Sequence, residues 1–238
     1  MTPPIVHVKD EPNEVAHLFA KFLSEKITEQ KELSIALSGG STPALLFDIL
    51  SKNYTYLDWE RVHFYWGDER CVDPDSDESN FKMTREHLLN NISVPVQNIH
   101  RIMGENDPAK EAKRYSEELS NTLKIEDSLP IFDIIMLGMG TDGHTASIFP
   151  HEIELLNSTN FCEVATQPES GQKRITLTGK VINAAKNVCF LVTGQSKNEK
   201  VIEIFNKEGN WVKYPSSYID PLNGKLHWFM DSAAAGGL

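Results

Sequence analysis

LSIALSGGSTPALLFDIL, residues 33–50, is the stretch that decides the fold. LSIAL, at 33–37, is a short apolar run of the kind found in a buried strand, and PALLFDIL, at 43–50, has the apolar spacing of a helix. SGGST joins them as a tight loop, and Pro43 falls in the first helical turn, where a missing N–H costs nothing. A strand, a glycine loop and a helix in succession predict one unit of a parallel sheet covered by helices.

Apolar runs alternate with helix-period segments along the rest of the chain. Further strands are expected at residues 5–8, 62–66, 132–137, 174–178, 187–193 and 226–230. Further helices are expected at residues 11–30, 83–92, 108–123 and 196–205, the last opened by a capping box of Ser196 and Glu199. Residues 67–80 are expected to form a polar loop, and residues 233–238 a frayed tail. The pattern predicts the α/β class, with a mostly parallel sheet flanked by helices on both faces.

Length and charge limit the classes of function. A chain of 238 residues has a size common for one α/β domain, so residues 1–238 are expected to form a single domain. The formal net charge of -11 argues against nucleic acid as a partner, because proteins that bind it usually carry a basic face. A small phosphorylated metabolite remains compatible, since a few local cations and backbone amides can hold one phosphate.

The sequence also bears on where the protein works. No stretch approaches about 18 consecutive apolar residues, and the first residues lack the basic and apolar segments of a secretory signal, so no membrane partner is expected. The cysteines Cys71, Cys162 and Cys189 are odd in number and lack metal-ligand spacing, which fits reduced thiols. We therefore expect a cytoplasmic protein.

SGGSTP, residues 38–43, is a candidate phosphate cradle. Two glycines between a strand and a helix permit close backbone approach, and the N–H groups of the helix N-terminus attract an anion. The alternative is an ordinary tight turn in which Ser41 or Thr42 caps the helix. The segment is not a Walker loop, because the Gly-Lys-Ser/Thr ending is missing.

WGDER, residues 66–70, places three charged residues just beyond an apolar strand, where open α/β sheets gather ligands. The cluster is either part of a site or a solvated turn. The DPDSDE that follows does not fit a calcium loop, because Pro74 intrudes, Glu78 stands at the glycine position and Thr84 replaces the closing glutamate.

GMGTDGHTASIFP, residues 138–150, follows the strand expected at 132–137. Its glycines match G-x-G-x-x-G, but Pro150 comes too soon for the long helix of a dinucleotide-binding unit. The triplet of Asp142, Gly143 and His144 is more informative, because a histidine exposed beside an acid can act as a base near neutral pH. Two further segments, KRITLT with Lys173 and Arg174 and TGQSK with Lys197, supply cations that could meet a phosphate.

Together, SGGSTP, WGDER, GMGTDGHTASIFP, KRITLT and TGQSK, in this order between residues 38 and 197, resemble the motif set of the 6-phosphogluconolactonase family. That family is related to the glucosamine-6-phosphate deaminases, which share the glycine loop and the Asp-Gly-His triplet. The resemblance implies a Rossmann-like fold and hydrolysis of 6-phospho-D-glucono-1,5-lactone to 6-phospho-D-gluconate in the pentose phosphate pathway. It implies neither a cofactor nor a metal.

The resemblance also implies roles for particular residues. His144 matches the general base that takes a proton from water, and Asp142 would orient it or help shape the pocket. Ser38, Gly39, Gly40 and Ser41 would hold the 6-phosphate. The basic residues Arg70, Arg174 and Lys197 would bind phosphate or polarise the substrate, and Asp68 would line the sugar side.

Two other functions stay open from the sequence. A glucosamine-6-phosphate deaminase would need a glutamate where Phe149 precedes Pro150, and a non-catalytic phosphosugar-binding module would have no use for His144 as a base. The sequence leaves open a monomer or a small homo-oligomer, and whether residues 211–224 reach the site or only cover the core.

Overall fold

A computed structural model describes residues 3–238 of the chain. Its centre is a seven-stranded sheet in the order β1-β12-β11-β8-β2-β3-β5, in which all neighbouring strands are parallel. These strands span Ile5–Lys9 (β1), Leu33–Leu37 (β2), Val62–Trp66 (β3), Ile99–His100 (β5), Ile134–Leu137 (β8), Asn187–Val192 (β11) and Lys225–Asp231 (β12). The apolar runs form central strands because helices cover both of their faces. The predicted α/β fold with a mostly parallel sheet is confirmed.

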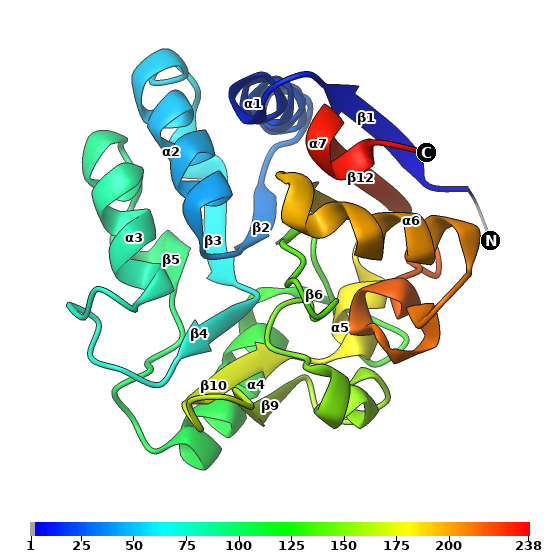
Figure 1. Ribbon diagram of the computed structural model, residues 1–238. Coiled ribbons are helices and arrows are strands. Elements are labelled where there is room, and N and C mark those ends of the chain that lie inside the picture. Colours follow the sequence, from blue (N-terminus) through cyan, green and yellow to red (C-terminus); the bar gives the residue numbers. More distant parts are fainter. Residues whose placement is uncertain (1–2) are drawn as a thin grey trace.

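Helices flank this sheet. They span Pro12–Glu29 (α1), Ser41–Asn53 (α2), Asn80–His87 (α3), Pro108–Thr122 (α4), Gly179–Ala184 (α5), Asn198–Asn206 (α6) and Ser232–Ala235 (α7). In Figure 1, α1, α2 and α3 stand side by side across the top and left of the view, whereas α4 lies at the bottom. Within residues 3–238, every helix is too short or too polar to cross a lipid bilayer.

A second, antiparallel sheet corrects the expectation of a polar loop at 67–80. It has the order β4-β10-β9, with bounds Asp68–Arg70 (β4), Lys173–Leu177 (β10) and Cys162–Thr166 (β9). Charged residues are rare in strands, so three in a row hid β4. Pairing with the apolar strand β10 overrides that preference. A short hairpin of Lys124–Glu126 (β6) and Leu129–Ile131 (β7) was also missed.

Two helix predictions were wrong at their ends, and the prediction of a frayed tail was wrong as well. α3 begins at Asn80 and stops at His87, and a separate 3-10 turn covers Leu89–Asn91. α6 begins only at Asn198 after a 3-10 turn at Gln195–Lys197, so Ser196 and Glu199 form no capping box. The expected tail contains α7, which is held because Asp231 caps it and its small alanines fit against the core.

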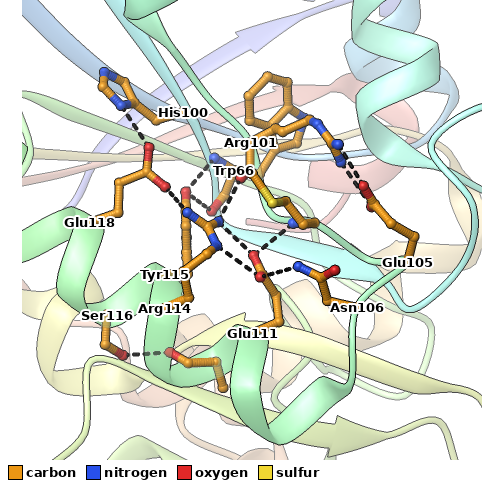
Figure 2. A network of polar contacts seen from close by, with 12 residues as sticks. Trp66, His100, Arg101, Glu105, Asn106, Glu111, Arg114, Tyr115, Ser116 and Glu118 are labelled. Atoms are coloured by element: carbon orange, nitrogen blue, oxygen red, sulfur yellow. Dashed lines mark hydrogen bonds and ion pairs between the residues drawn. The ribbon is translucent and has the colours of Figure 1, made fainter.

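Polar contacts attach α4 to the sheet and to the loop before it (Figure 2). The hydroxyl of Tyr115 accepts a hydrogen bond from the amide of Trp66 at 2.9 Å and donates to the carbonyl of the same residue at 3.1 Å. Buried Glu111 accepts from the amide of Met103 and from the guanidinium of Arg114. Tyr115 thereby fixes the carboxyl end of β3, where the chain turns into β4.

The order of the strands creates a crevice. From β2 the chain moves outward to β3 and β5, and it then returns to β8 on the other side of β2. Loops leaving the carboxyl ends of β2 and β8 therefore diverge, and open α/β sheets bind their ligands at such a point.

Candidate active site

A cleft of about 250 Å³ opens at this crevice. Its lining comes from the loops after β2 and β8, from β4 and β10, and from the starts of α3 and α6. The lining residues are Ser38, Gly39, Asp68, Arg70, Asn80, Gly138, Met139, Gly140, His144, Ala146, Arg174 and Lys197. The structure thus brings together seven of the candidate residues, from five separate segments of the sequence.

The glycine loop contributes Ser38 and Gly39 to the cleft. The Ser38 hydroxyl is buried without a hydrogen-bond partner among the described residues, so it is free to meet a ligand. Gly40 is the N-cap of α2 with φ of 107°, a conformation that favours glycine, and no side chain caps this helix. Gly40 and the exposed Ser41 lie at the helix N-terminus outside the cleft lining, so only their backbone groups are placed to help hold an anion.

His144 and Asp142 form a close pair. Oδ1 of Asp142 lies 2.6 Å from Nδ1 of His144 and also accepts from the His144 amide at 3.1 Å. Burial alone would raise the pKa of Asp142, but its hydrogen bonds with His144 outweigh burial and hold that pKa below the usual range. The Asp142 carboxylate is therefore ionised and holds the Nδ1 proton, which leaves Nε2 of His144 as the basic nitrogen.

The position of the His144 ring explains why residue 140 is a glycine. A side chain at Gly140 would come within 2.1 Å of the His144 ring, so only glycine leaves room for it. The loop continues into an isolated bridge between Thr145 and Ile148 and then a 3-10 helix at Pro150–Leu156, where a dinucleotide site would need a long α-helix. The G-x-G-x-x-G match therefore does not lead into a dinucleotide-binding helix.

Residues 211–224, whose role the sequence left open, brace this loop. Gly143 has φ of 82°, and a side chain there would come within 2.5 Å of Tyr214. Ser216 donates to the Gly143 carbonyl from its amide at 3.1 Å and from its hydroxyl at 2.9 Å. This segment therefore fixes the backbone next to His144 without lining the cleft.

Three cations face the cleft. β4 and β10 pair so that Arg70 lies opposite Arg174, and the Nε atoms of both are buried without a partner among the described residues. Burial lowers the pKa of Arg174, with Asp68 opposing that shift and Arg70 adding to it. Burial likewise lowers the pKa of half-buried Lys197. Lys173, by contrast, is exposed and donates to Thr166, outside the lining.

Asp68 and Asn80 complete the floor of the cleft. Oδ2 of Asp68 accepts from the Ser147 hydroxyl at 2.7 Å and lies 3.9 Å from Nη1 of Arg174. Asn80, which the sequence analysis missed, is 2% exposed and donates from Nδ2 to the Asp68 carbonyl at 3.0 Å. Across residues 3–238, no group of three His, Cys, Asp or Glu side chains converges as metal ligands would.

The fold and the cleft place the chain in the class of α/β proteins with a ligand crevice at the carboxyl end of a parallel sheet. A model of the family described as glucosamine-6-phosphate isomerases/6-phosphogluconolactonase matches residues 9–228. The chain belongs to this family.

Individual relatives agree. The chain is 45% identical over 202 residues to a 6-phosphogluconolactonase of Haemophilus influenzae, covering 84% of this chain and 85% of that one. The structure of 6-phosphogluconolactonase from Trypanosoma brucei matches with a TM-score of 0.90 at 28% identity, over 99% of each chain. A monomeric glucosamine-6-phosphate deaminase matches with a TM-score of 0.83 at 19% identity, which shows a shared fold alone.

Proposed function

We propose that this chain is a 6-phosphogluconolactonase, which hydrolyses 6-phospho-D-glucono-1,5-lactone to 6-phospho-D-gluconate in the pentose phosphate pathway. The observation that carries the proposal is the Asp142–His144 pair at the edge of a cleft that also holds three cations. A base and an anion site in one small cleft suit a phosphorylated ester substrate. The lactonases among the relatives match the chain over most of its length.

The proposed reaction begins with docking of the phosphate. Ser38, Gly39 and the N–H groups at the start of α2 hold it, with help from the neighbouring cations. Neutral His144 then takes a proton from water through Nε2, and the resulting hydroxide attacks the lactone carbonyl. The imidazolium that forms is stabilised by Asp142. Arg70, Arg174 or Lys197 stabilises the oxyanion. Collapse of the tetrahedral intermediate breaks the bond between the carbonyl carbon and the ring oxygen, and the imidazolium of His144 returns its proton to that oxygen, which becomes the free hydroxyl of the open-chain acid.

Phe149 separates this reaction from that of a deaminase. It stands where the deaminase motif carries a glutamate, and its ring packs 4.8 Å from that of His144 and 5.9 Å from the guanidinium of Arg174. An apolar ring cannot exchange a proton with His144 during opening of an amino sugar. The Phe149 ring instead shields one side of the histidine from water.

The remaining expectations stay proposals. We propose a single domain over residues 1–238, supported by one continuous cluster of buried apolar residues. The three cysteines are free, which supports a reducing compartment such as the cytoplasm. A monomer or a small homo-oligomer is compatible with this fold.

Lactone hydrolysis tests the function directly. Initial rates with fresh 6-phosphogluconolactone, in the presence of EDTA, are compared for the intact protein, His144→Ala and the control His17→Ala, in which an exposed histidine of α1 is removed. We expect His144→Ala to lose about a hundred- to ten-thousandfold in kcat and the control to lose nothing. An intact protein no faster than spontaneous hydrolysis rules out the lactonase, and release of ammonia from glucosamine 6-phosphate would then identify a deaminase. If His144→Ala is fully active, the protein is still a lactonase, but His144 is not its general base.

A further inference from the structure

Glu69 lies between two cleft residues yet faces away from the cleft. Side chains alternate along a strand, so Asp68 and Arg70 of β4 point into the cleft and Glu69 points to the other side. Glu69 is 2% exposed, and no ion pair to it is found among residues 3–238. A buried carboxylate without a cation is costly, so its hydrogen bonds must explain why it is there.

Three of the four hydrogen bonds of the Glu69 carboxylate connect β4 to the start of α3. Oε1 accepts from the amides of Arg70 and Asn80, both at 2.8 Å. Oε2 accepts from the amide of Phe81 at 2.8 Å and from the hydroxyl of Ser79 at 3.2 Å. Every partner is a donor, as an ionised carboxylate at the N-terminus of a helix requires. Burial raises the pKa of Glu69, and the hydrogen bonds from the amides of Asn80, Phe81 and Arg70 oppose that shift.

Capping α3 does not by itself require Glu69. Ser79 is the N-cap of this helix, and its hydroxyl oxygen already accepts from the amide of Lys82 at 3.1 Å. What Glu69 adds is a fixed distance between β4 and the first residue of the helix, Asn80.

Asn80 connects the start of α3 to the lining of the cleft. Its Nδ2 donates to the carbonyl of Asp68, and its Oδ1 occupies the space beside Gly39, only 1.8 Å from where a side chain at Gly39 would begin. Asn80 therefore fills the gap between the glycine loop and β4. Any displacement of the start of α3 would change the separation of these two walls of the cleft.

We propose that Glu69 is a positioning residue that, through Asn80, sets the spacing between the glycine loop and the Asp68–Arg70 wall of the cleft. The inference rests on the proposed function, since it assigns the glycine loop to phosphate and the opposite wall to the sugar. Glu69 acts without touching the substrate, and Asn80 is the cleft residue through which it acts.

Glu69→Gln is the sharpest perturbation. Glutamine has the same shape as glutamate, but an NH₂ group replaces one of the two carboxylate oxygens. That NH₂ group would face hydrogen-bond donors, so the hydrogen bonds of the replaced oxygen are lost. We expect kcat/KM per folded molecule to fall about tenfold or more, mainly through KM, and the affinity for inorganic phosphate, measured by calorimetry, to fall in parallel. Asp133→Asn is the matched control, because Asp133 is also buried and accepts from the Ser34 amide and hydroxyl at the amino end of β2. It should lower stability and leave both readouts unchanged.

A double-mutant cycle separates positioning from simple stabilisation. If Glu69 acts through Asn80, Asn80→Ala should reduce kcat/KM by a similar factor. The kcat/KM of the double variant should then be no lower than that of the more impaired single variant. Additive losses would overturn the inference, as would an unchanged kcat/KM and phosphate affinity in Glu69→Gln. If Glu69→Gln fails to fold, the test depends on Asn80→Ala, and an unchanged phosphate affinity in that variant would by itself overturn the inference. An inactive intact protein rejects the proposed function, whereas the phosphate measurements still decide the positioning role.

Discussion

Replacing Asp142 with asparagine tests how the carboxylate supports His144. One oxygen of Asp142 meets both the ring Nδ1 and the amide of His144. An asparagine with its Oδ1 in the same place keeps both hydrogen bonds and the ring tautomer, and loses only the negative charge. Asp142→Asn therefore isolates the stabilisation of the imidazolium from the orientation of the ring.

The expected size of the effect follows from the lost charge. A charge-assisted hydrogen bond contributes about 1–1.5 kcal/mol more stabilising free energy than a neutral one. The Asp142 side chain is 41% exposed, so solvent screening keeps the value at the lower end of that range. Since about 1.4 kcal/mol corresponds to a factor of ten, about 1 kcal/mol corresponds to a factor of about five, and Asp142→Asn should lower kcat about fivefold. Asp142→Ala, which also frees the ring, should lower it about a hundredfold.

The assay is the initial rate of lactone hydrolysis, followed by acid release in a pH-stat and corrected for the spontaneous reaction. Asp127→Asn is the matched control, because it removes the same charge from the exposed turn between β6 and β7. A kcat for Asp142→Asn equal to that of the control would show that the carboxylate charge plays no part. A kcat as low as that of His144→Ala would show that asparagine fails to hold the ring, which contradicts the geometry described above.

Three further results are expected. Burial lowers the pKa of Lys197, and the charge of Asp142 opposes that shift. As pH increases, KM should therefore begin to rise at a less alkaline pH than the loss of charge on an ordinary lysine would give. If KM of Lys197→Arg rose over the same pH range, Lys197 would not be the group responsible, because arginine stays charged there. Tyr115→Phe leaves the buried Trp66 amide without its acceptor and should lower the free energy of unfolding by about 1–3 kcal/mol in a urea titration; an unchanged midpoint would refute it. Burial, with adjacent His7, lowers the pKa of His227 to about 4, so the stability from its neutral ring is lost as pH falls from about 6.5 to about 4. His227→Phe should flatten the Tm-against-pH curve in that window, and an unaltered slope would exclude this histidine.

The sequence predicted the main sheet because its strands are buried on both faces. Apolar runs such as residues 33–37 and 62–66 became strands with the bounds expected. β4 was missed because its three charged side chains are stabilised by contacts distant in sequence, with Ser147, Ser79 and Arg174 among them. The tail was misjudged because short alanine side chains carry little periodicity, although Ala234 and Ala235 are buried.

The candidate site was predictable where a motif carries its own chemistry. His144 with Asp142 and the glycine loop are recognisable from a few consecutive residues. Asn80 is not, because nothing in its neighbourhood distinguishes it from other loop asparagines, and its role depends on Gly39 and Asp68 being brought to it by the fold. Glu69 was read as one of three loop charges, and only strand alternation shows that it faces the opposite way.

The pairing register of β4 and β10, which places Arg70 opposite Arg174, affects the stability of the native protein. Burial and the neighbouring charge of Arg70 disfavour the charged form of Arg174 and lower its pKa, and Asp68, 3.9 Å away, offsets them only in part. On the proposed function, a phosphorylated ligand bound beside Arg174 offsets this cost, so binding it should raise the free energy of unfolding. Under the same proposal, affinity for the ligand is gained at some loss of stability in the empty protein.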